Sequence, residues 1–449
     1  MNVYLDYNAT TPVDPAVVEA MLPFLRENFG NAGSVHTPGQ RARAAVDAAR
    51  ASAAALIGAQ PKEIVFTSGG TEADNLAIFG TIAAVEKGDG ITRHVSQAGS
   101  AMNARNGENT SSRKSAGSAN DAARAKSAGG ASAAAAGKPR KHVITSAIDH
   151  HAVLHACEEL ERRGIDVTYI PVSHARESQG LVDPEDVRRA IRPETVLITI
   201  MHANNELGVI QPIEEIGRIA REAGVRFHCD AVQSAGKVPL DVNRLGVDLL
   251  SISAHKFCGP KGVGALYVRE GTALEPLVRG GHAERDRRPG TENVPGIVAI
   301  GKAAELSRKL LVEEMTRIGA LRDRLEAALL ERIPRAHVNG DRKHRVPNTL
   351  NLTFSGAGGE AMMISLDLQG IACSTGAACS SGSTEPSHVL IAAGLSYDDA
   401  RSSLRLSLGR PTTEAEIEYA IEKIPAVVER LRALSPREQN FPASVASAR

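Results

Sequence analysis

Cysteine is scarce in this chain, with five residues in 449 and no regular spacing between them. This odd, scattered set argues against a disulfide framework and favours a reducing cytoplasm. No apolar run approaches the roughly 18 residues of a membrane helix, so we expect no membrane association. The first residues, MNVYLDYNATTP, contain neither a basic leader nor an apolar core, and we therefore expect no export signal.

Neither sign of charge is in excess, because 52 Lys and Arg residues are balanced by 52 Asp and Glu residues. Nucleic-acid-binding surfaces usually show a basic surplus, so we expect no direct nucleic-acid partner. Apolar side chains make up 42% of the chain, which is enough to build the cores of more than one domain.

Short apolar runs alternate with amphipathic segments over residues 1–270. This alternation predicts an α/β domain with a mostly parallel sheet, helices on both faces and ligands beyond the carboxyl ends of the strands. The expected strands are Ile64–Thr67, His142–Ser146, Val167–Pro171, Val196–Met201, Val225–Asp230, Leu249–Ser253 and Gly264–Val268. The expected helices include Glu72–Val85, His151–Arg162, Pro184–Ile191 and Ile213–Ala223.

The pattern changes near Gly296, where a long helical segment begins and runs to about Arg332. Short strands and further helices follow it, which predicts a smaller α+β unit. The expected elements there are the strands His337–Asn339, Thr349–Phe354 and Ser403–Ser407 and the helices Gly359–Leu368 and Glu414–Leu434.

Residues 88–140 consist mainly of Ala, Ser, Gly and Asn, with only three large apolar residues. Such a composition cannot offset the entropy cost of ordering, so we expect a disordered low-complexity insertion. Its surplus of Lys and Arg allows a basic arm for a partner, but a solubilising insertion is the simpler interpretation.

An acid and an amine follow two predicted strands. Asp230 ends the run Val225–Cys229, and Lys256 follows the run Leu249–Ile252. Adjacent strands would bring both groups to one crevice. Pyridoxal phosphate needs such a pair, a lysine for the Schiff base and an acid for the pyridine nitrogen. Either residue alone is also typical of an ordinary strand end.

Three further features could carry chemistry. Thr67–Glu72, with the sequence TSGGTE, joins a strand to a helix and could hold a phosphate, although small residues are common in such turns. Cys379 lies in a run of Gly, Ser, Thr and Ala, which favours an exposed nucleophile over a buried structural thiol. His150 follows a strand and could stack on a cofactor or move a proton, although His151 and His155 beside it weaken this signal.

Together these segments resemble the cysteine desulfurases of the NifS/IscS type, within the aspartate-aminotransferase-like fold (type I) of pyridoxal-phosphate enzymes. The resemblance covers nearly the whole chain outside residues 88–140 and the last few residues. It is carried by the stretches YLDYNATTPVDP, EIVFTSGGTEADNLAI, MHANNELGVIQPI, FHCDAVQSAGK, SAHKFCGPKGVGALYVR, RRPGTENV, TGAACSSGSTEPSHVL and SLRLSLGRPTTEAEI.

The resemblance implies a role for each matching residue. Lys256 corresponds to the Schiff-base lysine, Asp230 to the partner of the pyridine nitrogen, and His150 to the histidine stacked on the ring. Gln233 and Asn205 correspond to contacts near the ring hydroxyl. The positions that bind phosphate are Gly70, Thr71, Ser253, His255 and Thr291, of which Thr291 would reach across from a second subunit and so implies a homodimer.

The resemblance also implies how the substrate is held and how the sulfur leaves. Arg405 and Asn31 correspond to the pair that holds the carboxylate of L-cysteine. Cys379 corresponds to the cysteine that accepts the sulfur as a persulfide, on a long loop, and alanine is released. The persulfide would pass to an iron–sulfur scaffold or to a tRNA-thiolation carrier, and Cys379 could transiently ligate iron through it.

We expect four parts in the chain. Residues 1–15 form an N-terminal segment that packs with the small domain, and residues 16–270 form the large coenzyme-binding domain. Residues 271–435 form the small domain with the Cys379 loop, and residues 436–449 form a flexible tail. The loop Gly280–Asp286, GGHAERD, departs from the family's usual GGGQERG or GGGHERG.

Three other functions remain open at this point. A class-V aminotransferase would keep Lys256 and Asp230 but would not need Cys379. A selenocysteine lyase would use Cys379 only to discriminate against sulfur. A sulfur-relay protein that had lost its coenzyme would not need the intact lysine, acid and phosphate loop.

Overall fold

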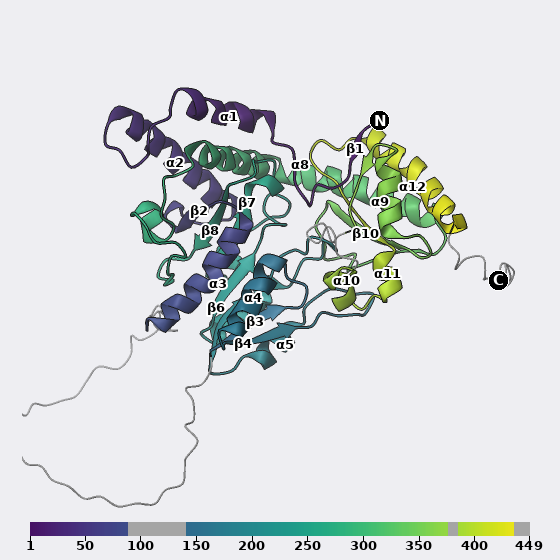
Figure 1. Cartoon of the computed structure of the whole chain (residues 1–449), viewed down its shortest axis with the longest axis horizontal. Helices are drawn as coiled ribbons and strands as arrows, with labels where there is room; N and C mark the ends of the chain where they lie inside the picture. The colour runs from purple at the N-terminus through teal and green to yellow at the C-terminus, as the bar shows by residue number, and fades with distance from the viewer. Residues whose placement is uncertain (89–140, 376–384, 435–449) are drawn as a thin grey trace, which may run out of the picture.

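A seven-stranded sheet lies at the centre of the larger part of the chain, in a computed structural model that describes residues 1–88, 141–375 and 385–434. The strand order is β2-β8-β7-β6-β5-β3-β4 (Figure 1). The predicted insertion, apart from Gly88, lies outside the described residues, as do Cys379 and the predicted tail. The strands are β2 Ile64–Thr67, β3 His142–Ser146, β4 Asp166–Ile170, β5 Thr195–Thr199, β6 Arg226–Asp230, β7 Leu249–Ser253 and β8 Gly264–Val268.

The sheet is mostly parallel, as predicted, with one strand reversed. The neighbours β4, β3, β5, β6 and β7 pair in parallel, whereas β8 is antiparallel to both β7 and β2. Only residues 254–263 separate β7 from β8, which is shorter than the dozen or so residues that a parallel crossover needs. The chain therefore turns back and carries Lys256 within this short connection.

Alternate residues of the strands fill two different cores, because helices cover both faces of the sheet. Ile144 and Ile198 pack with one cluster, while their neighbours Val143 and Leu197 pack with another. This explains why the strands are continuous apolar runs. The helices of this part are α1 Pro15–Arg26, α2 Thr37–Leu56, α3 Gly70–Glu86, α4 His151–Arg162, α5 Pro184–Ala190, α6 Ile213–Glu222 and α7 Val242–Leu245.

Helices α1 and α2 were not among the expected elements. Helix α2 buries mainly small residues, including Ala42, Val46, Ala49 and Ala53, so its apolar periodicity is weak in the sequence. It packs along α8, Val294–Arg332, close enough that a Cβ on Gly301 would lie 2.6 Å from the Cβ of Ala49.

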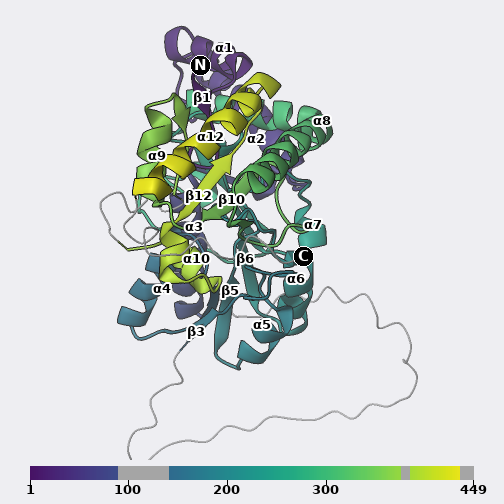
Figure 2. The same ribbon diagram turned by 90° about the vertical axis from the view of Figure 1, so that its right-hand side faces the viewer.

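A smaller antiparallel sheet, in the order β12-β10-β9, forms the second unit (Figure 2). Its strands are β9 Ala336–Val338, β10 Thr349–Phe354 and β12 Ser403–Ser407, and β1 Val3–Tyr4 pairs in parallel with β11 Ile371–Ala372 beside it. The helices there are α9 Gly359–Asp367, α10 His388–Ala392, α11 Tyr397–Arg401 and α12 Glu414–Leu434.

Helix α8 belongs to both units. Its 39 residues extend about 58 Å at the helical rise of ~1.5 Å per residue. Ile297 and Ile300 near its start pack with the large core, and Leu321 and Leu325 further along pack with the small core. Val3 and Leu5 also join the small core. The domain limits given above stay a prediction.

Within the described part of the chain, none of the helices combines the length and the apolar character that a membrane crossing requires. Most predicted elements differ from the observed ones by a few residues at most, such as the helix expected at Glu72–Val85 and found as α3.

Candidate active site

Asp230 and Lys256 lie at the ends of neighbouring parallel strands, as the sequence predicted. Asp230 is the last residue of β6 and pairs in register with Ser251 of β7, and Lys256 closes the 3₁₀ turn Ala254–Lys256 after β7. Burial raises the pKa of Asp230 to about 6, while the hydrogen bond from Val232 N–H and the positive charge of Lys256 oppose the increase. The carboxyl group and the amine therefore act on each other electrostatically.

The amine of Lys256 rests on the N-terminal segment. Its Nζ donates hydrogen bonds to the backbone oxygens of Asn8, at 2.6 Å, and Ala9, at 3.0 Å. Thr11 holds the segment in place, because both its N–H and its hydroxyl donate to the backbone oxygen of His255 at 2.9 Å. Residues near the start of the chain thus form one wall beside this lysine.

His150 caps the start of α4, and the positive charge of Lys256 acts on its ring. Its Nδ1 accepts a hydrogen bond from Ala152 N–H at 3.1 Å, so a neutral ring carries its proton on Nε2. Burial lowers the pKa of His150 to about 4, and the positive charge of Lys256 contributes to the decrease. The imidazole is therefore neutral at pH 7, with Nε2–H available as a proton donor.

The turn before α3 packs so closely against Val232 that only glycine fits at position 70. A Cβ on Gly70 would lie 2.7 Å from Cγ2 of Val232 and 3.6 Å from Cβ of Ser253. Gly70 and the exposed Thr71 open a helix of 17 residues, whose first N–H groups attract anions. His255, on the lysine turn, shares a hydrogen bond with Thr10 through Nδ1 at 3.2 Å. The N–H groups at this helix start suit the phosphate of a coenzyme.

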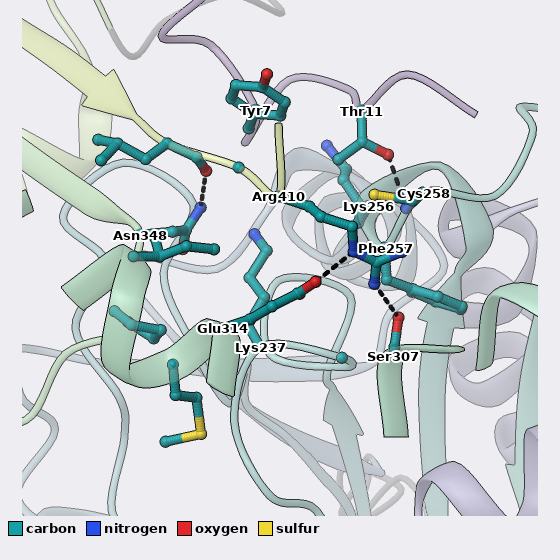
Figure 3. Close-up of a pocket in the computed structure, with 16 residues that line it drawn as sticks. Tyr7, Thr11, Lys237, Lys256, Phe257, Cys258, Ser307, Glu314, Asn348 and Arg410 are labelled. Atoms are coloured by element: carbon teal, nitrogen blue, oxygen red, sulfur yellow. Dashed lines mark hydrogen bonds and ion pairs between the residues drawn. The ribbon is translucent and has the colours of Figure 1, made fainter. Parts of the chain in front are cut away.

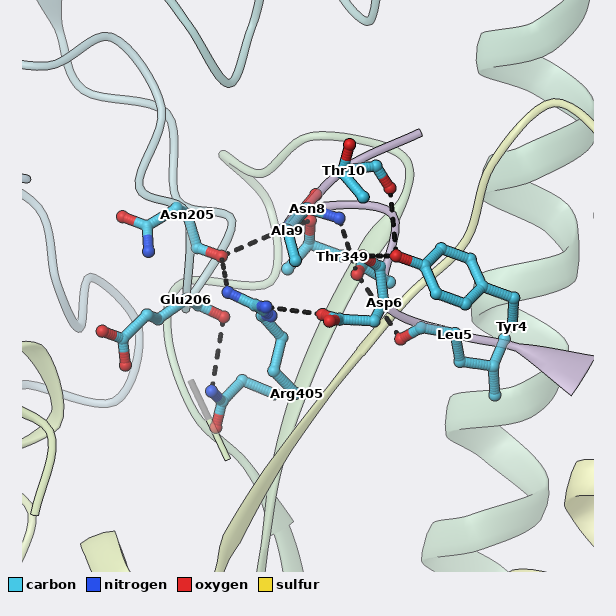
Figure 4. A network of polar contacts seen from close by, with 12 residues as sticks. Tyr4, Leu5, Asp6, Asn8, Ala9, Thr10, Asn205, Glu206, Thr349 and Arg405 are labelled. Carbon is cyan, nitrogen blue, oxygen red and sulfur yellow. Dashed lines mark hydrogen bonds and ion pairs between the residues drawn. The ribbon is translucent and has the colours of Figure 1, made fainter. Parts of the chain in front are cut away.

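Arg405 on β12 faces the same region from the small sheet (Figure 4). Its guanidinium donates to the backbone oxygen of Asn205 at 3.1 Å and to the carboxylate of Asp6 at 2.6 Å. The side chain is buried, yet its Nε–H has no hydrogen-bond partner among the described residues. A buried donor without a partner is costly, and a substrate carboxylate would satisfy it.

Three other predicted residues lie in different surroundings. Gln233 is buried and donates from Nε2 to the backbone oxygen of Asn8 at 2.9 Å, so it belongs to the lysine's neighbourhood. Asn31 is exposed on the connection between α1 and α2, and Thr291 is exposed just before α8. The carboxamide of Asn31 accepts from Gly33 N–H at 2.8 Å, so its oxygen is engaged within its own loop.

Sequence reasoning missed Asn8, a buried residue that links Lys256 to Asn205 and to the small sheet. Its backbone N–H donates to Ser407 Oγ at 3.0 Å, and its side-chain amide donates to Thr349 Oγ1 at 2.8 Å and to the Asn205 oxygen at 3.0 Å (Figure 4). Its partners lie up to 399 residues away in the chain. No local pattern could have shown this role.

Glu206 is a second residue that the sequence did not single out. Its buried carboxylate accepts a hydrogen bond from the Ser387 hydroxyl at 2.5 Å, and burial raises its pKa. Ser387 follows residues 376–384 in the chain, so Glu206 anchors the chain on one side of the Cys379 segment.

The four described cysteines are all buried and free of disulfides, namely Cys157, Cys229, Cys258 and Cys373. Burial raises the pKa of each of these thiols, which disfavours the reactive thiolate. Cys379, the predicted sulfur acceptor, is the fifth cysteine and lies outside the described residues. Among residues 1–88, 141–375 and 385–434, no three His, Cys, Asp or Glu side chains form a group that could hold a metal ion.

Comparison with known proteins agrees with this geometry. The model of the family described as aminotransferase class-V matches residues 3–111 and 115–420. The protein "Cysteine desulfurase IscS" of Dictyoglomus turgidum is 44% identical over 440 residues, which cover 98% of each chain. The protein of the same name from Methanosarcina thermophila is 46% identical over 434 residues, covering 97% of this chain and 94% of the relative.

Solved structures give the same result. One titled "NIFS-LIKE PROTEIN" is 33% identical, with a TM-score of 0.79, and the match covers 96% of this chain and 100% of that one. Another, titled "SspA in complex with cysteine", is 34% identical with a TM-score of 0.69, covering 90% and 98%. These likenesses confirm the predicted type I fold and the dependence on pyridoxal phosphate that this fold family shares. The chain belongs to the aminotransferase class-V family, among its cysteine desulfurases.

Proposed function

We propose that this chain converts L-cysteine to L-alanine and transfers the sulfur to its own Cys379 as a persulfide. The observation that carries this proposal is the arrangement of Lys256, Asp230 and Arg405, which gather an amine, a buried acid and a carboxylate-binding guanidinium around one region. The relatives named cysteine desulfurase, at 44–46% identity over almost the whole chain, support the same reaction.

The residues present fit pyridoxal phosphate. Lys256 would hold the coenzyme covalently, Asp230 would face its pyridine nitrogen, and His150 would lie against its ring. Gln233 and Asn205 would contact the ring hydroxyl, and the phosphate would be bound by Gly70, Thr71, Ser253 and His255. When bound, the coenzyme withdraws electrons from the substrate's α-carbon and makes its proton easier to remove.

The chain's own groups would then divide the remaining work. Arg405 binds the substrate carboxylate, with its unsatisfied Nε–H as one donor. Lys256 takes the proton from the α-carbon and later returns one to the product. His150, neutral at pH 7, holds a proton on Nε2 for transfer near the substrate sulfur.

Cys379 acts as the nucleophile in this proposal. Its thiolate attacks the substrate sulfur, so an S–S bond forms while the C–S bond breaks and leaves its electron pair on the carbon. Protonation of that carbon gives alanine. The four described cysteines support this assignment, because burial makes their thiols poor nucleophiles.

A homodimer would complete the site. Asn31 and Thr291 are exposed in a single chain, and large apolar side chains lie exposed beside Asn31, with Phe29 at 81% and Val35 at 88%. Apolar groups exposed to this degree favour burial against a partner. A Val35→Asp chain should then sediment as a monomer where the wild type sediments as a dimer; equal sedimentation of the two would contradict this interface.

The persulfide would be delivered in the cytoplasm to an iron–sulfur scaffold or to a carrier for tRNA thiolation. In this proposal Cys379 ligates iron only transiently, through the persulfide sulfur.

The test is a Cys379→Ser chain, with Cys157→Ala as the control for a buried thiol. The Cys379→Ser protein should keep the visible absorbance of its bound coenzyme but release no more than a trace of alanine from excess cysteine. The control should keep most of its activity. Full activity without Cys379, or amino transfer to an added 2-oxo acid as the main reaction, would refute the proposal in favour of an aminotransferase.

A further inference from the structure

A second lysine, Lys237, lies close to the site and plays no part in the mechanism above. It follows β6 and the turn that contains Gln233. Its Nζ donates a hydrogen bond to Oε1 of Gln233 at 2.8 Å and another to Oδ1 of Asn8 at 3.0 Å. Both acceptors are neutral amide oxygens, which is an unusual environment for a half-buried lysine.

Asn8 also holds Lys256. The backbone oxygen of Asn8 accepts from Nζ of Lys256 at 2.6 Å and from Nε2 of Gln233 at 2.9 Å. Lys237 therefore donates to the side-chain oxygens of Asn8 and Gln233. Lys256 donates to the backbone oxygen of Asn8, which also accepts a hydrogen bond from the Gln233 amide. The four residues form one hydrogen-bonded group.

Both lysines also line one small cavity, next to Thr11 and Arg410 (Figure 3). The free space in it is about 40 Å³, which is room for no more than a few water molecules. Arg410 is neutralised there by Glu314 and by Asp14, whose carboxylate lies 2.8 Å away.

The surroundings of Lys237 disfavour a proton on its amine. Burial holds the pKa of Lys237 well below its ordinary value, and the positive charges of Lys256 and Arg405 lower it further. Two amines that share a buried region titrate as a pair, so a proton on one disfavours a proton on the other.

We propose that Lys237 is a positioning residue for Lys256, which fixes Asn8, directly and through Gln233, so that the backbone oxygen of Asn8 is the resting place of the Lys256 amine. The inference rests on the proposed role of Lys256 as the lysine that binds the coenzyme and moves the α-proton. When the amine is not joined to the coenzyme, it lies on the Asn8 oxygen, and it must be unprotonated to accept a proton from substrate.

The test compares Lys237→Met, which removes the amine, with Lys237→Arg, which keeps N–H donors for Asn8 and Gln233, and with Lys62→Met on the surface. The readouts are the pH midpoint of the bound coenzyme's visible band, and kcat and KM for cysteine. For Lys237→Met we expect a midpoint that differs from that of wild type by about one pH unit, because Asn8 and Gln233 lose the amine that fixes them beside the nitrogen of Lys256. We also expect kcat to fall about tenfold and KM to stay within about twofold.

The Lys237→Arg midpoint should stay near the wild-type value, and Lys62→Met should match wild type in every readout. A Lys237→Met midpoint equal to that of wild type would overturn the inference, even if kcat fell, because the role would then be purely structural. A Lys237→Arg midpoint that is shifted as far as the Lys237→Met midpoint would overturn the inference too. If the Met chain does not fold, Lys237→Gln is judged by the same criteria.

The outcome can be separated from the failure of the proposed function. If wild-type protein binds the coenzyme but releases no alanine from cysteine, the desulfurase proposal fails. The midpoint comparison still decides the role of Lys237 in that case, because it needs only the bound coenzyme.

Discussion

The guanidinium of Arg405 is held by the Asp6 carboxylate, 2.6 Å away, so a residue of β12 is oriented by the first residues of the chain. A second contact, to the Asn205 oxygen, comes from the large unit. Three distant segments thus set the direction of the side chain that we propose binds the substrate carboxylate. The orientation of Arg405 toward a substrate carboxylate therefore depends on Asp6 as well as on Arg405 itself.

We predict that Asp6→Asn raises KM for cysteine about fivefold, which corresponds to ~1 kcal/mol for one weakened charged hydrogen bond. The guanidinium loses its anionic anchor, while the groups that move protons are unchanged, so kcat should change less than KM. Steady-state kinetics test this. Asp14→Asn is the matched control, because Asp14 forms a similar pair with Arg410, and Asn can still cap α1. An unchanged KM for Asp6→Asn would contradict the role of this pair.

Gly70→Ala should weaken coenzyme binding about tenfold, since its Cβ would lie 2.7 Å from Val232 Cγ2 and would distort the turn that we propose holds the phosphate. Titration of the coenzyme-free protein, followed by absorbance, measures the dissociation constant. Gly358→Ala is the control, because a Cβ added there would meet no described atom within 4 Å. Equal affinity in Gly70→Ala and wild type would place the phosphate elsewhere.

Buried His202 should make the protein less stable in acid. Burial lowers its pKa to about 4 from an ordinary 6.5, and its Nδ1 has no hydrogen-bond partner within the part of the chain that the structure describes. As the pH falls from 6.5 towards 4, the unfolded chain binds a proton that the folded chain excludes, so stability is lost across this window. Between pH 7 and pH 5 the loss from this group should be about 2 kcal/mol.

Urea unfolding of His202→Gln at both pH values tests this expectation. Between pH 7 and pH 5 the free energy of unfolding of the variant should fall by about 2 kcal/mol less than that of wild type, whatever the variant's stability at pH 7. The exposed His155→Gln should follow wild type. Parallel pH dependence of wild type and His202→Gln would mean that the ring of His202 is protonated in the folded state.

Asp286 is in a left-handed backbone conformation, with φ of 64°, in the loop where the family usually has glycine. Asp286→Gly should stabilise the protein by up to ~1 kcal/mol, because glycine adopts this conformation without strain. The exposed contact with His282 that is lost contributes little. Asp286→Ala should instead destabilise it by about 1 kcal/mol. Thermal unfolding of wild type, Asp286→Gly and Asp286→Ala measures the order of their stabilities. An Asp286→Gly protein less stable than Asp286→Ala would contradict this prediction.

The order of the main elements could be predicted because each buried strand is an apolar run with a clear beginning and end. Asp230 and Lys256 were found for the same reason, since each closes such a run and β6 and β7 turned out to be neighbours. The reversal of β8 was not predicted, although the short connection after Ser253 dictates it.

The remaining site residues could not be predicted from the sequence, for physical reasons. Asn8, Glu206 and Lys237 act through contacts with segments far away in the sequence, and periodicity carries no information about such contacts. The roles assigned to Asn31 and Thr291 came from the resemblance alone, and they stay predictions that a second chain would have to fulfil.

The contacts of Asn8 also have a consequence for biosynthesis. Its partners Thr349 and Ser407 leave the ribosome hundreds of residues after Asn8 does, so the catalytic centre cannot be completed until synthesis is nearly finished. The nascent large unit can acquire its sheet early, but its N-terminal strand must wait for a docking site.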